Sequence, residues 1–271
     1  MTFINVTSIT TKEFSKFSQF IYDFAGIKLS PVKKIMVGNR LSKRLKFFQL
    51  DTFTQYYDLV MSKEYPNEMQ MMVDILTTNE TYFFREPQHF DYLRDNVIKH
   101  FKGSKFRIWS AASSSGEEAY SLAMLLSENL LKVPWEVIGS DLSKTVLAKA
   151  QIGIYPMSRL ELLDNKLMKK YCLKGVRSHE GTFRIDKKLR ERTHFGQVNL
   201  IEPITANVGM FDVIFLRNVL IYFDTQTKKR VVEQIIAKLK PGGLFFISHA
   251  ETLSQITDVL DMIHPSIYMK K

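Results

Sequence analysis

The chain has 271 residues, 45% of them hydrophobic, with a formal net charge of +10 and one cysteine, Cys172. This length is enough for one large domain or two modest ones. The single cysteine excludes an internal disulfide and a cysteine zinc cluster, and no apolar run reaches the roughly 18 residues that span a membrane. The positive charge favours an anionic partner: a nucleic acid, a membrane surface or an acidic protein.

The first residues show no targeting pattern. Met1–Phe14 contains no basic segment followed by an apolar one, so we expect no signal peptide. Together with the single cysteine, this predicts a cytoplasmic protein in a reducing compartment.

The first 76 residues are predicted to form a small all-α domain. Thr10 and Glu13 have the spacing of a capping box, and apolar residues follow at helical intervals. A second helix is expected to begin at Pro31, a tolerated first-turn position. A third helix is expected after Thr52 and a fourth near Pro66.

The predicted second helix is strongly basic. No acidic residue occurs between Lys28 and Asp51. Such a helix is either a solvated face or a docking face for an acidic partner. We favour docking, because like charges repel one another unless a partner offsets them. The docking candidates are Lys33, Arg40, Lys43 and Arg44.

The chain is organised around a strand, a loop of small residues and a helix over Phe106–Tyr120. In an open α/β sheet such a loop lies at the carboxyl end of a strand, where ligands bind. Glu117 and Glu118 occupy the helix start, where a phosphate site would avoid negative charge. We therefore expect a ligand that is cationic or rich in hydroxyls, such as S-adenosylmethionine. The alternative is that both glutamates only complement the helix dipole.

The next strand supports a cofactor that contains a nucleoside. The segment Trp135–Ser140 reads as a strand and is followed directly by Asp141. An acid at this place is typical of the residue that holds ribose hydroxyls in nucleotide-binding folds.

The rest of the chain continues the alternation of strands and helices. Residues 179–195 indicate a small antiparallel excursion that includes a strand at Thr193–Phe195. Strands are expected at Phe211–Leu216, at Leu244–Ser248 and in the tail, with a helix from about Thr225 to Lys240. The pattern predicts a doubly wound α/β sheet whose strand ends carry the site.

Six motifs in this order and spacing resemble the CheR family of chemotaxis receptor methyltransferases over essentially the whole chain. They are TNETYFFRE, RIWSAASSSGEEAYSLAM, SDLSKTVLAKAQIGIY, VNL, FDVIFLRNVLIYF and LKPGGLFFISHAE. The resemblance implies a Rossmann-like methyltransferase domain over residues 101–271, with a β-subdomain insert at about 171–195. Residues 77–100 would be a linker that contacts the cofactor, and residues 1–76 a receptor-facing helical domain.

The resemblance also implies an activity and its residues. Such an enzyme is a protein-glutamate O-methyltransferase, which transfers a methyl group from S-adenosylmethionine to chemoreceptor glutamates in sensory adaptation. Residues expected to orient the substrate carboxylate are Arg85, Arg217 and Tyr222. The cofactor-binding residues would be Asn79, Thr81, Arg85, Glu117, Asp141, Asn199, Leu200, Arg217 and Asn218.

Partners and metals follow from the same resemblance. In some family members the β-subdomain binds a tethering peptide at the receptor C-terminus. Here Val176-Arg177-Ser178 follows Gly175, where a glycine-rich turn is expected, so tethering stays open. We expect no metal, and we interpret His89, His179, His194 and His249 as ordinary histidines. A monomer is expected.

Two other functions compete with this one. A nucleic-acid methyltransferase would fit the basic charge, yet the chain has no Pro-Pro pair beyond the strand at Phe211–Leu216. A non-catalytic module that senses the cofactor or binds a receptor is the second alternative.

Overall fold

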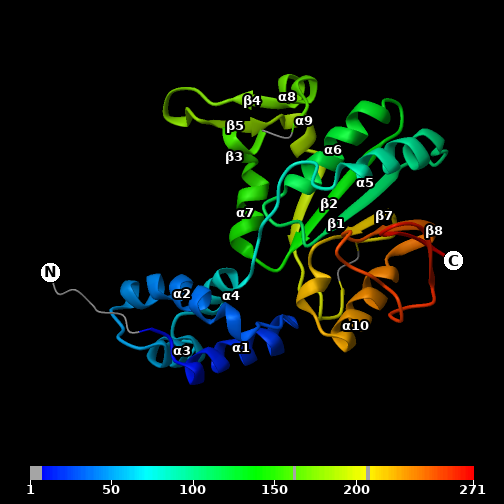
Figure 1. Ribbon diagram of the computed structural model, residues 1–271. Helices are drawn as coiled ribbons and strands as arrows, with labels where there is room; N and C mark the ends of the chain where they lie inside the picture. The colour runs from blue at the N-terminus through cyan, green and yellow to red at the C-terminus, as the bar shows by residue number, and fades with distance from the viewer. Residues whose placement is uncertain (1–7, 161–162, 206–207) are drawn as a thin grey trace. The chain divides into compact units, whose positions relative to one another are not determined.

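The computed structural model describes residues 8–160, 163–205 and 208–271. The chain forms two compact units (Figure 1). The first, here called the helical unit, is Met1–Thr78 with Tyr222–Thr227. The second, the sheet unit, is Asn79–Ile221 with Lys228–Lys271. Among the described residues, no helix has the length and apolar character needed to cross a membrane.

The helical unit contains the four predicted helices, which are α1 (Thr11–Ala25), α2 (Lys34–Phe48), α3 (Phe53–Met61) and α4 (Glu68–Leu76). The predicted capping box at Thr10 and Glu13 is confirmed. A second capping box, Thr52 with Gln55, begins α3. The predicted second helix begins with a 3-10 turn at Pro31–Lys33 before it becomes α-helical.

Glu13 joins the starts of two helices. One carboxylate oxygen accepts the Thr10 backbone N–H at 2.9 Å, and the other accepts the Thr54 backbone N–H at 3.0 Å. Burial would raise the pKa of this carboxyl, but the hydrogen bonds from Thr10 and Thr54 outweigh it and lower the pKa. The ionised glutamate therefore stabilises the packing of α1 against α3.

Two of the predicted docking arginines have partners inside the helical unit. Arg44 donates to both carboxylate oxygens of Glu68 at 2.7 and 2.6 Å, and Tyr56 donates to the same buried carboxylate at 2.7 Å. Arg40 donates to the carbonyl oxygens of Ile75 and Thr77 at the end of α4. These contacts hold α4 against α2, so both guanidinium groups serve the packing of the helices.

The sheet unit is built on seven strands in the order β6-β2-β1-β7-β8-β10-β9. The first five run parallel, and the last two form an antiparallel hairpin at the edge. In chain order the bounds are β1 (Phe106–Ala111), β2 (Trp135–Asp141), β6 (Thr193–Gln197), β7 (Phe211–Leu216), β8 (Leu239–Phe246), β9 (Leu260–His264) and β10 (Ile267–Lys270).

Helices cover both faces of this sheet, as the doubly wound prediction requires. In Figure 1, α6 (Glu117–Asn129) and α10 (Thr225–Ile236) lie on opposite faces. The helix α5 (Pro87–Tyr92) continues through a π-helical and a 3-10 turn to His100, and α7 (Lys144–Ile152) packs on β2 and β6. Stacking of Phe215 on Phe246, with ring centres 4.4 Å apart, joins β7 to β8 in the core.

The small antiparallel excursion is a separate three-stranded sheet in the order β3-β5-β4. Its strands are β3 (Ile154–Pro156), β4 (Cys172–Lys174) and β5 (Thr182–Ile185), and the short helices α8 (Asn165–Tyr171) and α9 (Lys187–Arg190) flank it. The expected strand at Thr193–Phe195 differs from the prediction. It is β6, which pairs parallel with β2 in the main sheet, because strand partners are set by tertiary contacts and not by local alternation.

The expected helix after Thr225 is shorter than predicted. It ends at Ile236, and β8 already begins at Leu239. The Pro241-Gly242-Gly243 segment lies within this strand, next to a register shift against β7. Proline and glycine thus mark an irregularity of the strand at this point and not the end of the helix.

We predict that Arg44→Ala destabilises the full chain by about 2–3 kcal/mol, because it leaves the Glu68 carboxylate buried without its bidentate partner. The exposed Lys43 on the same helix is the matched control, and Lys43→Ala should change stability by less than about 0.5 kcal/mol. Urea-induced unfolding measures both. Equal unfolding midpoints for the two variants would refute the structural role of Arg44.

Candidate active site

The candidate site lies where the loops that follow β1, β2, β6 and β7 leave the sheet. The chain passes from β1 to β2 and β6 on one side, then returns to β7 on the other side of β1. The strand order therefore reverses between β1 and β7. In open α/β sheets this switch point, at the carboxyl ends of the strands, is where ligands bind.

The loop after β1 has an unusual backbone. Ala112, Ser114 and Gly116 all have positive φ angles of 61°, 50° and 95°. A Cβ at Gly116 would lie 2.8 Å from the Cβ of Ala150, so this position requires glycine. The loop is held by Tyr155 of the small sheet, whose hydroxyl donates to the Ser115 carbonyl at 2.6 Å. The predicted loop of small residues is thus a fixed structure.

Asp141 connects this loop to the one that follows β2. One carboxylate oxygen accepts the Ser114 backbone N–H at 2.9 Å, and the other accepts the Ser143 backbone N–H at 2.9 Å. The residue is 8% exposed. Asp141 therefore connects the loops after β1 and β2 at the place where the sequence predicts the ribose to bind.

Glu117 places a second buried carboxylate beside the same loop. It is 1% exposed, and the Ser115 hydroxyl donates to it at 2.7 Å. Burial raises the pKa of this carboxyl. Nearby, the Ser113 hydroxyl is buried without a hydrogen-bond partner among the described residues. A cationic group that donates hydrogen bonds would satisfy both side chains.

The segment from Asn79 to Arg85 runs along this loop. The Ser114 hydroxyl donates to the Asn79 carbonyl at 2.9 Å, and Arg159 donates to the Thr81 carbonyl. Arg85 is only half-buried, donates to the Glu80 carbonyl at 3.1 Å and lies 5.5 Å from the centre of the Tyr82 ring. Other N–H groups of its guanidinium therefore remain able to donate hydrogen bonds to a ligand.

Arg217 is predicted to contact the cofactor and the substrate carboxylate, but its side chain is buried among groups of the protein. Its side chain is 1% exposed and forms ion pairs with Glu86 at 3.1 Å and with Glu118 at 3.0 Å. It also donates to the Arg85 carbonyl. These internal contacts occupy both terminal nitrogens of the guanidinium group, whereas its buried Nε has no hydrogen-bond partner among the described residues. The geometry therefore favours a supporting role over direct contact with a substrate.

Asn218 is likewise fixed by its neighbours. It has a φ of 59°, and its side chain donates to the Ser248 hydroxyl at 2.7 Å. Its backbone N–H donates to Glu251, which also accepts the Ser248 and Ile221 backbone N–H groups. Burial raises the pKa of Glu251. Glu251 thus organises the turn after β7.

Asn199 and Leu200 follow β6 on the other side of Asp141. The Val198 backbone N–H donates to the Asp141 carbonyl at 3.0 Å, which connects the two strand ends. Asn199 accepts the Ile201 backbone N–H at 3.4 Å, and Leu200 is 9% exposed. A polar and an apolar group are therefore available next to Asp141.

Residues 79–269 match the family described as CheR methyltransferase, SAM binding domain, and residues 12–77 match CheR methyltransferase, all-alpha domain. The chain belongs to the CheR methyltransferase family. It is 37% identical over 263 residues to a chemotaxis protein methyltransferase of Salmonella typhimurium, which covers 96% of this chain and 91% of the relative. It is 39% identical over 251 residues to one of Escherichia coli, covering 92% of this chain and 87% of the relative.

The residues of this CheR chain fit S-adenosylmethionine, the cofactor of its family. The ribose hydroxyls match an acceptor such as Asp141. The amino group of the methionine part matches the buried Glu117 carboxylate with the unpartnered Ser113 hydroxyl. Leu200 would offer an apolar surface to the adenine, with the polar Asn199 beside it in the chain.

Tyr222 belongs to the helical unit and not to the sheet unit that contains the other candidates. The Lys33 ammonium lies 4.8 Å from the centre of its ring, and its carbonyl accepts the Lys28 backbone N–H at 2.9 Å. A neighbouring contact joins Tyr22 to Asp224 at 2.6 Å. These contacts place Tyr222 beside the basic residues Lys28 and Lys33 of the helical unit.

Glu118 is expected with Glu117 at the helix start but is not among the predicted site residues, and the sequence analysis missed Glu251. Both act on other site residues, Glu118 through Arg217 and Glu251 through the turn at Asn218. Glu118 also accepts the Ser110 hydroxyl at 2.7 Å, and burial raises its pKa although Arg217 opposes this effect. The signal for Glu118 in the sequence was the pair of glutamates at the start of the helix.

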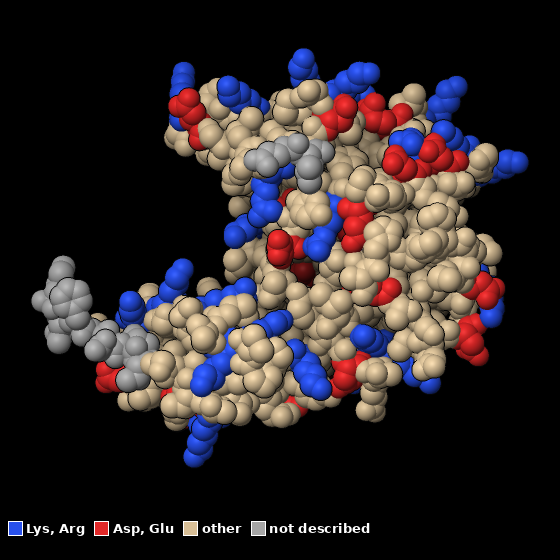
Figure 2. Space-filling model, viewed as in Figure 1, with Lys and Arg blue, Asp and Glu red and all other residues tan. Residues whose placement is uncertain are grey.

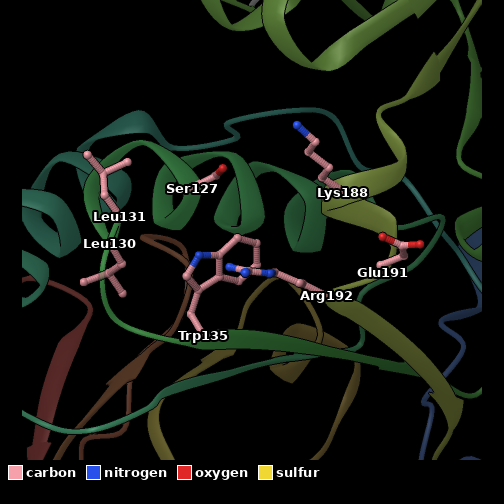
Figure 3. A pocket seen from close by; sticks show the side chains of 7 residues that line it. All are labelled: Ser127, Leu130, Leu131, Trp135, Lys188, Glu191 and Arg192. Atoms are coloured by element: carbon pink, nitrogen blue, oxygen red, sulfur yellow. The ribbon is translucent and has the colours of Figure 1, made fainter.

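A separate cavity of about 370 Å³ lies at the amino end of β2 (Figure 3). Trp135 and Arg192 line it, with the guanidinium 5.0 Å from the indole ring centre, together with Leu130 and Leu131. Since ligands of this fold bind at the carboxyl ends of the strands, this cavity is not the candidate site.

We predict that Asp141→Asn lowers the affinity for S-adenosylhomocysteine at least about tenfold, which is about 1.4 kcal/mol. An amide in place of the carboxylate loses an acceptor for the two loops and for the ribose. The exposed Asp258→Asn should bind as the unmodified chain does. Isothermal titration calorimetry measures both, and unchanged affinity of the Asp141 variant would refute the assignment.

Proposed function

We propose that this chain transfers the methyl group of S-adenosylmethionine to glutamate side chains of methyl-accepting chemoreceptors, giving methyl esters. The observation that carries the proposal is the match of both CheR families, which together extend from residue 12 to residue 269. The relatives named chemotaxis protein methyltransferase support a chemoreceptor as the substrate.

The proposed chemistry needs little from the protein besides alignment. A glutamate carboxylate is ionised at pH 7 and is itself the nucleophile. Bound S-adenosylmethionine supplies an electrophilic methyl group on a positively charged sulfur. Because the opposite charges disappear during transfer, a partly dry site that aligns the reacting groups accelerates the reaction. This agrees with a candidate site that is rich in fixed backbone contacts and buried carboxylates.

We assign the orientation of the substrate carboxylate to Arg85 in the sheet unit, and Tyr222 stays a separate candidate on the helical unit. Arg85 is half-buried and retains donors, as described above. Arg217 acts indirectly on the substrate. It donates to the Arg85 carbonyl and pairs with Glu86, so it fixes the backbone from which the Arg85 side chain extends. Asn79, Thr81, Glu117, Asp141, Asn199, Leu200 and Asn218 remain the proposed cofactor-binding residues.

We also propose that residues 1–76 form the receptor-facing domain in the cytoplasm and that residues 77–100 link it to the cofactor site. The proposed docking face on α2 and the 3-10 turn before it combines exposed Lys43 with the apolar residues Val32, Ile35 and Phe47, which are 90%, 72% and 68% exposed. Lys33 stays a candidate for this face. Arg40 and Arg44 contribute to it indirectly, because their contacts hold α4 against α2.

The β-subdomain offers a second basic surface for a monomeric enzyme to hold its receptor. Residues 164–192 contain ten lysines and arginines but only four acids. Figure 2 shows these side chains projecting over the region of α8, α9 and the small sheet. The edge strand β4 carries Leu173, which is 55% exposed. An acidic receptor peptide that pairs with this edge would match its charge.

Transfer of radiolabelled methyl from S-adenosylmethionine tests the proposed function. Membranes that contain chemoreceptors, total RNA and total DNA serve as parallel acceptors. We expect label in the receptor band that mild base releases, since carboxyl methyl esters are base-labile. Label in nucleic acid, or cofactor binding without any transfer, would contradict the proposal.

We predict that Lys43→Glu slows receptor methylation and that the effect grows as ionic strength falls, because screening of exposed charges is then weaker. Affinity for S-adenosylhomocysteine should not change. The matched control is Lys63→Glu, which reverses an exposed charge of the helical unit outside α2. If both variants methylate receptors at the same rate in low salt, α2 is only a solvated face.

A further inference from the structure

Three side chains from two distant parts of the chain meet next to the candidate site. They are Glu86 before α5, His89 within α5 and His249 after β8. One potential ligand atom from each lies within 4.8 Å of the others. Glu86 Oε2 is 3.4 Å from His89 Nδ1 and 4.0 Å from His249 Nε2.

Ser266 determines how the two imidazole rings are oriented. Its hydroxyl donates to the Pro265 carbonyl at 2.6 Å, so its one proton is used there. The Ser266 oxygen is also 2.7 Å from His89 Nε2 and 3.0 Å from His249 Nδ1. With its proton on the Pro265 carbonyl, Ser266 accepts a hydrogen bond from both rings. In this arrangement the proton of each neutral ring lies on the nitrogen that faces Ser266.

The remaining nitrogen of each ring then presents a lone pair toward Glu86. His89 Nδ1 has no hydrogen-bond partner among the described residues, and His89 is 1% exposed. A buried acceptor without a donor is costly. Here that acceptor faces a carboxylate oxygen, which is also an acceptor. A cation between these atoms resolves the conflict.

The surrounding charges allow a cation despite the nearby Arg217. Arg217 Nη2 lies 3.1 Å from Glu86 Oε2, and its charge weakens cation binding. However, Glu118 pairs with the other side of the same guanidinium group at 3.0 Å. Two carboxylates against one guanidinium leave a net charge of −1, which favours a cation. Glu86 also accepts the Ser248 hydroxyl at 2.8 Å and the His249 backbone N–H at 3.3 Å.

We propose that Glu86, His89 and His249 form a binding site for a divalent metal ion of the Zn²⁺ class. Two imidazole nitrogens and one carboxylate oxygen are a ligand set that Zn²⁺ accepts, with a water in the fourth position. His249 is partly exposed, its side chain 43% accessible, so water can reach the site. Ser266 hydrogen-bonds to the two histidines and Ser248 to Glu86. Such hydrogen bonds to the ligand side chains orient them in metal sites.

The metal would fix the backbone beside Arg85. Phe84 and Glu86 both have positive φ angles, 53° and 57°, which are uncommon for residues other than glycine. Strained backbone of this kind persists where surrounding contacts determine it. A metal bound to Glu86 would add such a contact one residue from the proposed substrate-orienting arginine, without touching the substrate.

Calorimetric titration of Zn²⁺ into the tag-free, chelator-treated full chain tests this proposal. We expect saturable binding of one equivalent and at least about a tenfold loss of affinity in His249→Ala. The partly exposed His249 is preferred to the buried His89 because its loss should leave the fold intact. The exposed His179→Ala, a histidine outside the cluster, should bind Zn²⁺ like the unmodified chain.

A second readout separates the site from unspecific binding. Co²⁺ in place of Zn²⁺ should give the visible absorption of a four-coordinate ion in the unmodified chain and in His179→Ala, but not in His249→Ala. Binding of S-adenosylhomocysteine by the His249 variant checks that it is folded. The proposal is overturned if the unmodified chain shows no saturable Zn²⁺ binding, or if a folded His249→Ala binds with the same affinity and stoichiometry.

Discussion

The arrangement of the site depends on the ion pairs that Arg217 makes at the end of β7. A buried guanidinium group needs carboxylate partners, since an unpaired charge in the protein interior is very unfavourable. Here those partners are Glu86, in the segment before α5, and Glu118, in the first turn of α6. The pairing therefore holds three separate parts of the sheet unit together at the switch point of the sheet. Arg85 and two of the three proposed metal ligands, Glu86 and His89, lie on or directly after the segment that it fixes.

Asp141 has the corresponding role on the other side of β1. By accepting backbone N–H groups of Ser114 and Ser143, it fixes two loops that would otherwise be independent. Such pre-organisation suits methyl transfer to a carboxylate, for which alignment and exclusion of water matter more than a catalytic base. The described site residues accordingly hold backbone in place more often than they offer reactive groups.

The sequence predicted the features that local chemistry decides. Short segments of the chain are enough to predict three of these features. They are the capping box at Thr10, the alternation of strands and helices, and the acid at the end of β2. The family resemblance was also visible there, and both family matches confirm it.

Features that depend on distant partners were not predictable in the same way. The strand β6 pairs with β2, and Arg40 and Arg44 bind groups on α4 and after it, which no local pattern shows. The same holds for Arg217, whose position at a strand end suggested a ligand contact although its charge is neutralised inside the protein. His89 and His249 appeared ordinary because the fold alone brings them together.

A crystal structure of the chain with S-adenosylhomocysteine tests the central claim. The claim is that the loops fixed by Asp141 hold the nucleoside, while Arg217 stays inside the protein and fixes the segment that carries Arg85. We predict ribose hydroxyls within hydrogen-bond distance of the Asp141 carboxylate, adenine next to Leu200, and Arg217 still paired with Glu86 and Glu118. A ribose bound elsewhere, or an Arg217 side chain that leaves both glutamates to contact the ligand, would contradict this account.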